Sequence, residues 1–202
     1  WSGIPDTLET ETLEIPGYAA LATENSEPLR FNTENTAHYI TDYQGELLDA
    51  IVDNMASLDN LSKQQILQER RLLAESGVIS YASLLPVIEK LTQETSYLVV
   101  SAVSSILQGL SLFVDEGTEV EAAYKKLLVT FNQFNFERLG FEPKAGEADE
   151  DEMVRQLVIS NMIKGDDAKA SAKASEIYAA HADEISKLPA AIRLQILINQ
   201  IK

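Results

Sequence analysis

The chain has 202 residues, of which 45% are hydrophobic and 24% charged, and these values are typical of a soluble globular protein. Its 32 acidic and 16 basic residues give a net charge of −16, which argues against a nucleic-acid partner because phosphate binding needs clustered Lys and Arg. The absence of cysteine excludes disulfides, thiol nucleophiles and cysteine-based zinc sites. A reducing compartment is compatible with this composition, and we expect a cytoplasmic location.

The longest apolar region, residues 97–114, is interrupted by four serines, one glutamine and one glycine. Because a bilayer span needs roughly 18 or more apolar residues, we interpret this region as a buried helix and expect no membrane partner. No signal peptide is visible, and the chain begins at Trp1 rather than at Met. We therefore expect that it starts inside a larger polypeptide.

Residues 1–42 differ in composition from the rest of the chain. They contain three prolines and several threonines, and residues 10–15 alternate polar with apolar side chains, as short extended segments do. Residues 29–31 and 38–41 are further strand candidates. About forty residues of strand make a poor core alone. We expect this segment either to belong to a sheet whose other strands are missing or to pack on the helices.

From Tyr43 onward the apolar residues follow a helical period. Ser62 and Thr118 are the predicted N-caps of two helices, and Gly77 and Gly165 are predicted helix ends. The next helix should begin at residue 166, and the last near residue 189, where a proline is tolerated in a first turn. These signals predict about eight helices, joined by short polar turns into antiparallel pairs.

Several side chains are expected to face the core. Residues 97–114 are apolar on nearly all sides, which predicts a central helix. In the two helices that follow, Val120, Phe131, Met153 and Val154 should point inward. The predicted fold is mainly α: an α-solenoid-like array of about eight antiparallel helices over residues 43–202, preceded by a short β or extended segment over residues 1–42.

Metal and catalytic motifs are missing from the sequence. The only histidines are His38 and His181, without an H-E-x-x-H, so a two-histidine helical zinc site is excluded and both are interpreted as surface or packing residues. The acidic run 147–152 lacks the spacing of an EF-hand loop, and acids in a first helical turn complement the helix dipole. We find no phosphate-binding glycine loop and no nucleophile elbow, and we predict no catalytic residue, metal ligand or cofactor within the chain.

Arg155 lies one position past the packing pair Met153 and Val154, so we expect it to border the core. A carboxylate partner within the domain is the favoured role. Recognition of a peptide carboxylate is the alternative, because Arg presents a bidentate fork. Lys144 is a second candidate for such substrate binding because of its charge.

Four landmarks in order resemble the aminopeptidase N family of zinc peptidases. Residues 1–5, W-S-G-I-P, resemble a W-x-I-P strand near the end of the family's β-sandwich domain. Residues 32–43 resemble N-x-x-x-x-G-[FY]-Y-R-V-x-Y, and residues 81–97 resemble Y-x-x-x-L…L-x-x-E-x-x-Y. Residues 139–155 resemble L-G-W-E-P-K-x-G-E…L-x-R, with Phe141 in place of Trp.

The resemblance spans nearly the whole chain and includes specific matches and departures. The matching side chains in the two middle landmarks are Tyr39, Tyr43, Leu91, Glu94 and Tyr97. Ala37 stands where the family usually has Gly, Ile40 where it has Arg, and Val100 where a Trp is common. These departures indicate a divergent bacterial branch, and no role of the missing arginine is carried over.

The resemblance implies a multidomain parent protein that removes N-terminal residues from peptides. Its upstream thermolysin-like domain would bind zinc through H-E-x-x-H and a later Glu, and neither this motif nor the family's G-A-M-E-N segment occurs here. Residues 1–42 would be the end of a β-sandwich domain. Residues 43–202 would be the helical C-terminal domain, which covers the active site and shapes substrate access without catalysis. The implied partners are the upstream domains of the same polypeptide and peptide substrates.

An alternative from the residues alone is a freestanding α-solenoid scaffold that binds proteins through its concave face. It rests on the helix pairs and the acidic surface, and it requires a self-sufficient N-terminal region. The strand-poor start of the chain speaks against this reading. An independent enzyme is the weakest reading, because no nucleophile–base pair is recognisable.

Overall fold

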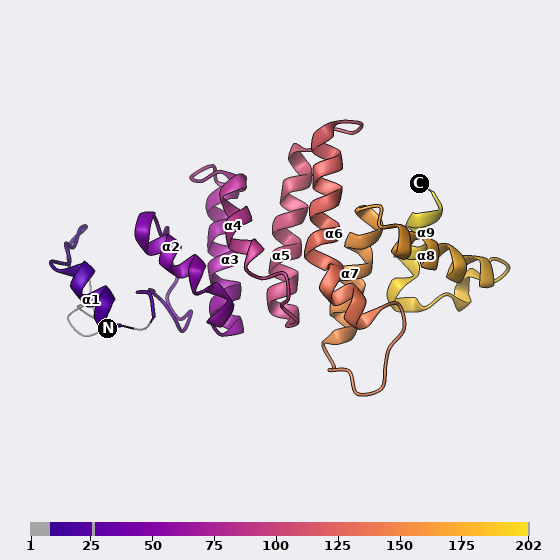
Figure 1. Ribbon diagram of the computed structural model, residues 1–202, viewed down its shortest axis with the longest axis horizontal. Helices are drawn as coiled ribbons and strands as arrows, with labels where there is room; N and C mark the ends of the chain where they lie inside the picture. Colours follow the sequence, from indigo (N-terminus) through magenta and orange to yellow (C-terminus); the bar gives the residue numbers. More distant parts are fainter. Residues whose placement is uncertain (1–8, 26, 202) are drawn as a thin grey trace.

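The computed structural model describes residues 9–25 and 27–201, and these form an elongated array of helices (Figure 1). The helices follow one another along the long axis in nearly the order of the chain, from α1 at one end to α8 and α9 at the other. The α-helices of the described part are α1 (Tyr18–Glu24), α2 (Gly45–Asp53), α3 (Asn60–Glu75), α4 (Leu85–Glu89), α5 (Tyr97–Leu110), α6 (Glu119–Leu139), α7 (Asp151–Lys164), α8 (Ala168–Ala180) and α9 (Arg193–Gln200). Short 3-10 turns, such as Tyr81–Leu84 and Ser111–Phe113, connect several of them. The predicted mainly α fold is confirmed.

The strands predicted near the N-terminus are absent from the described residues, so this part of the prediction was wrong. Residues 10–15, 29–31 and 38–41 form no strand, and residues 18–24 form the unpredicted helix α1. A strand exists only when a partner completes its hydrogen-bond ladder, and these segments have no such partner here. The first landmark, residues 1–5, lies outside the described residues, and the domain division at residue 42 stays a prediction.

Helix ends follow from local capping chemistry. The side chain of Thr118 accepts a hydrogen bond from the backbone N–H of Glu121 at 3.2 Å, which confirms Thr118 as the cap of α6. The cap of α3 is Asp59 rather than the predicted Ser62, because the Asp59 carboxylate accepts bonds from both the backbone N–H and the hydroxyl of Ser62. Gly165 is the C-cap of α7, as predicted.

Two buried clusters form the core, and α5 contributes to both. Val99 and Val103 of α5 lie in the first cluster, with residues from α2, α3, α4 and α6. Val100, on another side of the same helix, lies in the second cluster, with residues of α7, α8 and α9. The predicted central helix is therefore confirmed.

Two of the expected inward side chains point outward. Phe131 and Val154 are buried as expected, but Val120 is 55% exposed and Met153 is 45% exposed. Both lie in the first turn of their helices, α6 and α7, which the neighbouring elements leave uncovered at these positions. The apolar period of each sequence therefore begins one turn before the part of the helix that packs against its neighbours.

Candidate functional site

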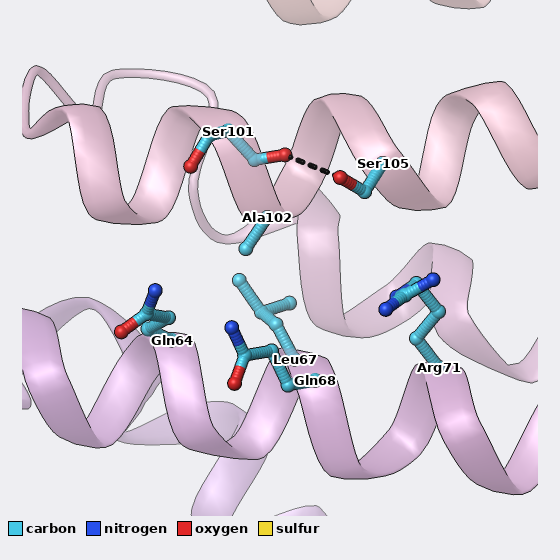
Figure 2. Close-up of a pocket in the computed structure, with 7 residues that line it drawn as sticks. All are labelled: Gln64, Leu67, Gln68, Arg71, Ser101, Ala102 and Ser105. Carbon is cyan, nitrogen blue, oxygen red and sulfur yellow. Dashed lines mark hydrogen bonds between the residues drawn. The ribbon is translucent and has the colours of Figure 1, made fainter.

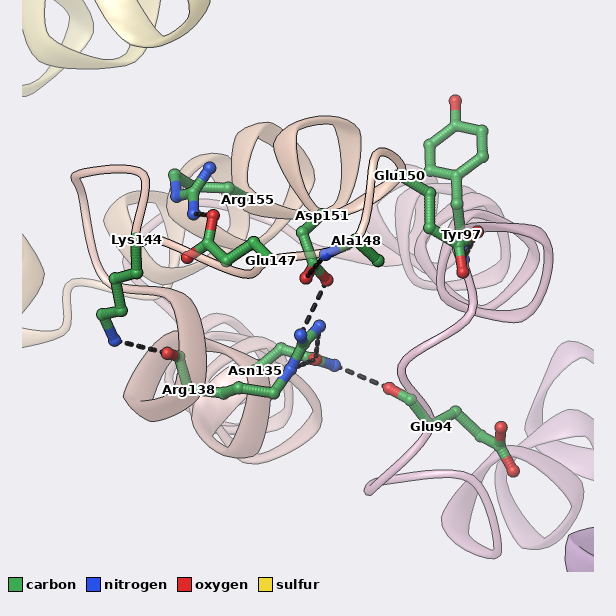
Figure 3. Close-up of polar contacts among 10 residues, drawn as sticks. All are labelled: Glu94, Tyr97, Asn135, Arg138, Lys144, Glu147, Ala148, Glu150, Asp151 and Arg155. Atoms are coloured by element: carbon green, nitrogen blue, oxygen red, sulfur yellow. Dashed lines mark hydrogen bonds and ion pairs between the residues drawn. The ribbon is translucent and has the colours of Figure 1, made fainter.

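Arg155 lies on α7 and is almost completely buried. Its guanidinium donates a hydrogen bond to the carboxylate of Glu147, which belongs to the loop between α6 and α7 (Figure 3). The Arg155 and Glu147 side chains are 4% and 16% exposed. The hydrogen bond from Arg155 holds the pKa of Glu147 below its ordinary value. The arrangement matches the favoured of the two predicted roles, a carboxylate partner within the domain.

Further polar contacts fix the same loop. The ammonium group of Lys144 is close to the end of α6 and donates to the backbone carbonyl of Arg138 at 2.5 Å (Figure 3). The guanidinium of Arg138 pairs with Asp151 at 2.6 Å, and the other oxygen of Asp151 accepts from the backbone N–H of Ala148 at 2.9 Å. The α6–α7 loop is therefore tied to both of the helices that it joins.

The structure brings together two landmarks that are separate in the sequence. The carboxylate of Glu150 accepts a hydrogen bond from the backbone N–H of Tyr97 at 2.9 Å. The side-chain amide of Asn135 donates to the backbone carbonyl of Glu94 at 2.7 Å (Figure 3). The Glu94 carboxylate in turn pairs with Lys63 of α3 at 2.6 Å. These contacts connect α3, α5, α6 and α7. Glu94 and the residues of the α6–α7 loop therefore help to hold these four helices in place relative to one another.

A polar cavity lies between α3 and α5, and we call it the α3–α5 groove (Figure 2). Its volume is about 70 Å³, and its lining residues are Gln64, Leu67, Gln68 and Arg71 of α3 with Ser101, Ala102 and Ser105 of α5. Amides, hydroxyls and a guanidinium can together donate and accept hydrogen bonds, as a peptide backbone requires. Sequence reasoning missed this groove, although Gln64, Gln68 and Arg71 recur at the spacing of one helical face.

The two histidines lie in different parts of the array. His38 precedes α2 and is exposed, whereas His181 caps the end of α8 and its Nδ1 lies 2.9 Å from the carbonyl oxygen of Ile177. Helix α2 lies next to α1 toward one end of the molecule, and α8 lies at the other end (Figure 1). Over residues 9–25 and 27–201, no group of three His, Asp or Glu side chains could hold a metal ion. The residues described here therefore do not fit the zinc that the resemblance implies for the parent protein.

No helix in the described part of the chain combines the length and the apolar character that a membrane crossing requires.

Comparison with known proteins connects these features to one family. Residues 29–202 match the model of the ERAP1-like C-terminal domain. The whole chain is 55% identical to a protein named Aminopeptidase N from Lactococcus lactis subsp. lactis, and 98% of it is 35% identical to an Aminopeptidase N from Lactobacillus delbrueckii subsp. lactis. Two thirds of it, 67%, is 29% identical to Aminopeptidase M1-B of Oryza sativa subsp. japonica.

The chain spans 24% of the length of each of the two bacterial relatives and 16% of the rice protein. The relatives confirm the resemblance to the aminopeptidase N family that the four landmarks predicted. Since the family model covers nearly all of the helical array, the chain belongs to the ERAP1-like C-terminal domain family.

Proposed function

We propose that this chain is the non-catalytic C-terminal domain of a zinc-dependent aminopeptidase, and that it covers the active site and shapes which peptides enter. The observation that carries the proposal is the 55% identity over the whole chain to a protein named Aminopeptidase N that is about four times as long. Bond cleavage and zinc binding belong to the upstream part of such a parent. The parent acts in the bacterial cytoplasm and removes N-terminal residues from peptides.

The chemistry of the α3–α5 groove supports a role in guiding peptides. Its glutamine amides can donate to and accept from a peptide backbone, and Arg71 can attract a carboxylate. The hydroxyls of Ser101 and Ser105 donate to backbone carbonyls within α5, so toward a peptide they can act as acceptors. Arg71 is 32% exposed and already pairs with Glu75 at 2.6 Å, so this attraction competes with an existing ion pair. The groove suits contacts with the extended part of a peptide, away from the bond that is cleaved.

Lys144 and Arg155 remain predicted contacts to a peptide carboxylate. Lys144 is exposed, and its ammonium group has donors left beyond the one bonded to the Arg138 carbonyl. Arg155 would first have to release Glu147. Of the two, Lys144 is the better placed for contact with a ligand.

Zinc analysis and an aminopeptidase assay of the full-length parent, beside this 202-residue chain, test whether catalysis belongs to the upstream part alone. We expect zinc in stoichiometric amount and hydrolysis of Leu- and Ala-anilides in the parent only. Zinc-dependent turnover by the chain itself would overturn the proposal.

Groove variants in the parent test the shaping of substrate access. We expect Gln64→Ala, which alters the α3–α5 groove alone, to change kcat/KM for long peptides by about two- to tenfold, as for one lost hydrogen bond, and to leave kcat/KM for anilides unchanged. The matched control is Gln133→Ala on α6, whose side chain pairs with Glu137 outside the groove. Equal effects of the two variants would argue against peptide guidance by this groove.

A further inference from the structure

A second groove lies along an adjacent face of α3, and we call it the N-terminal groove. It encloses about 520 Å³ between residues 35–40 and one face of α3. The lining side chains are Asn35, Ala37, His38, Tyr39, Ile40, Gln65, Gln68, Glu69 and Leu72. It shares Gln68 with the α3–α5 groove but is several times larger.

The N-terminal groove exposes large apolar side chains. Tyr39 and Ile40 are each 50% exposed, and Leu72 of α3 is 41% exposed. Phe31, which stacks on Tyr43 with ring centroids 6.4 Å apart, is 39% exposed close to the same segment. Apolar surface that stays in water forgoes the hydrophobic stabilisation that burial against a partner would give. Clustered exposed hydrophobic residues with polar neighbours are typical of an interaction surface.

The backbone that carries Tyr39 and Ile40 is anchored on both sides. Before them, the Asn32 side chain accepts from the backbone N–H of Ala37 and donates to its carbonyl, both at 2.9 Å. After them, the backbone N–H of Thr41 donates to the carboxylate of Glu69 at 3.3 Å.

Tyr43, two residues after Thr41, is buried and anchors the segment more deeply. The carbonyl of Tyr43 accepts from the buried guanidinium of Arg70 at 3.3 Å, and the Tyr43 hydroxyl accepts from the backbone N–H of Phe31 at 2.8 Å. The segment is thus held against α3 by buried side chains. The apolar surface is presented by a fixed backbone rather than by a loose end.

We propose that the N-terminal groove is the docking surface for the part of the parent polypeptide that precedes residue 1. The inference rests on the proposed function. The relatives are about four times as long as this chain, and the matching family is that of a C-terminal domain, so most of the remaining polypeptide comes before it. The groove is built partly from residues 35–40, which are closer in sequence to that upstream part than any residue of α3 is.

The chemistry of the groove also specifies the partner surface. Its apolar lining offers Tyr39, Ile40 and Leu72, which an apolar surface would cover, and its polar lining offers the exposed amide of Gln68. The Gln65 amide is buried and donates to the carboxylate of Glu69 at 3.1 Å, so it serves the groove wall rather than a partner. This combination of apolar and polar lining is typical of protein interfaces. A peptide substrate or a second copy of the chain are the competing occupants.

Hydroxyl-radical footprinting of the full-length parent tests the proposal directly. Because a docked surface excludes water, we expect Tyr39 and Leu72 to be oxidised roughly fivefold or more slowly than Val78 and Leu112, once each rate is divided by the intrinsic reactivity of its side-chain type. Val78 and Leu112 are the matched controls, being apolar, 61% and 81% exposed, and outside the groove. Oxidation of Tyr39 and Leu72 at rates comparable to those of the controls would overturn the proposal.

The same experiment separates the competing occupants. Protection that grows with protein concentration would assign the groove to a second copy, and protection that appears only with added peptide would assign it to substrate. Either result would overturn docking of the upstream part. The readout needs no turnover, so an inactive but protected parent would contradict the proposed function alone, and an active but unprotected parent would contradict the docking alone.

Paired variants in the parent provide an independent check. We expect Leu72→Asp to restore fast oxidation of Tyr39, because a carboxylate at the interface opposes docking, whereas Val78→Asp leaves Tyr39 protected. Equal oxidation of Tyr39 in the two variants would contradict the assignment. If Leu72→Asp fails to fold, footprinting of the unaltered parent remains decisive.

Discussion

The ion pair between the buried Arg155 and the partly buried Glu147 should make the stability of the fold depend on pH. The hydrogen bond from Arg155 lowers the pKa of Glu147 in the folded chain. A carboxyl with a lowered folded pKa stabilises the fold above its unfolded pKa, and this contribution is lost as the pH falls through the folded value. We therefore expect Glu147→Gln to lower the free energy of unfolding at neutral pH and to have a shrinking effect as the solution is acidified.

Urea unfolding of Glu147→Gln and of the unaltered chain over a pH series measures this difference in the free energy of unfolding. Glu116→Gln is the control, since Glu116 is also in a loop, is exposed, and makes no ion pair with the described residues. A difference between Glu147→Gln and the unaltered chain that stays constant with pH would contradict the assigned role of the ion pair.

The sequence could place Arg155 beside the core but could not choose its partner. Periodicity put it next to Val154, and the structure has it 3% exposed on α7. Its carboxylate comes from a loop residue eight positions upstream, and the loop reverses there at Gly146, whose φ is +84°. Such a reversal depends on loop geometry, which a helical period does not encode.

At the scale of elements, the turn from α7 to α8 packs tightly against α6. A Cβ atom on Gly165 would lie 2.8 Å from Cγ2 of Val129 and 2.9 Å from the backbone carbonyl of Lys125. The φ of Gly165 is −74°, so backbone strain is not the reason for glycine here. We expect Gly165→Ala to destabilise the chain by about 1–3 kcal/mol through overpacking, because the carbonyl cannot move aside cheaply.

Urea unfolding measures the stability loss of Gly165→Ala, and Gly77 provides a contrasting position for the same measurement. It has open space around a Cβ but a φ of +77°, so Gly77→Ala should cost about 1–2 kcal/mol from conformation alone. Asn adopts this conformation more readily, so Gly77→Asn should recover part of that loss, whereas Gly165→Asn should be worse than Gly165→Ala. Recovery at both positions would contradict the steric account of Gly165.

Helices were more predictable than the connections between them. The sequence identified Thr118 as a cap, Gly165 as an end and the central helix α5, because each depends on local chemistry or a sustained apolar period. It missed α1 and predicted strands before α2, because a strand is defined by partners distant in sequence. The α3–α5 groove also depends on which two helices pack together, and the sequence alone did not establish that pair.

At the scale of the whole molecule, the two buried clusters divide the array into two cooperative parts that share α5 and α6. Ile88 is fully buried in the first cluster, and Ile159 is fully buried in the second. In a linear array each element contacts only its neighbours, so stability is distributed locally rather than uniformly. The two ends of such a molecule can open separately.

Matched substitutions in the two clusters test this separation. We expect Ile159→Ala to cost about 2–5 kcal/mol within its own cluster and to speed amide hydrogen exchange in α7, α8 and α9 far more than in α3. Ile88→Ala should do the reverse, speeding exchange in α3 and α4 while leaving α8 and α9 close to their original rates. Hydrogen exchange followed by mass spectrometry under native conditions resolves the two regions. Equal acceleration of exchange along the whole array by either substitution would contradict separate opening. The chain would then unfold as one unit, because the contacts through α5 and α6 couple the two clusters more strongly than the clusters differ in stability.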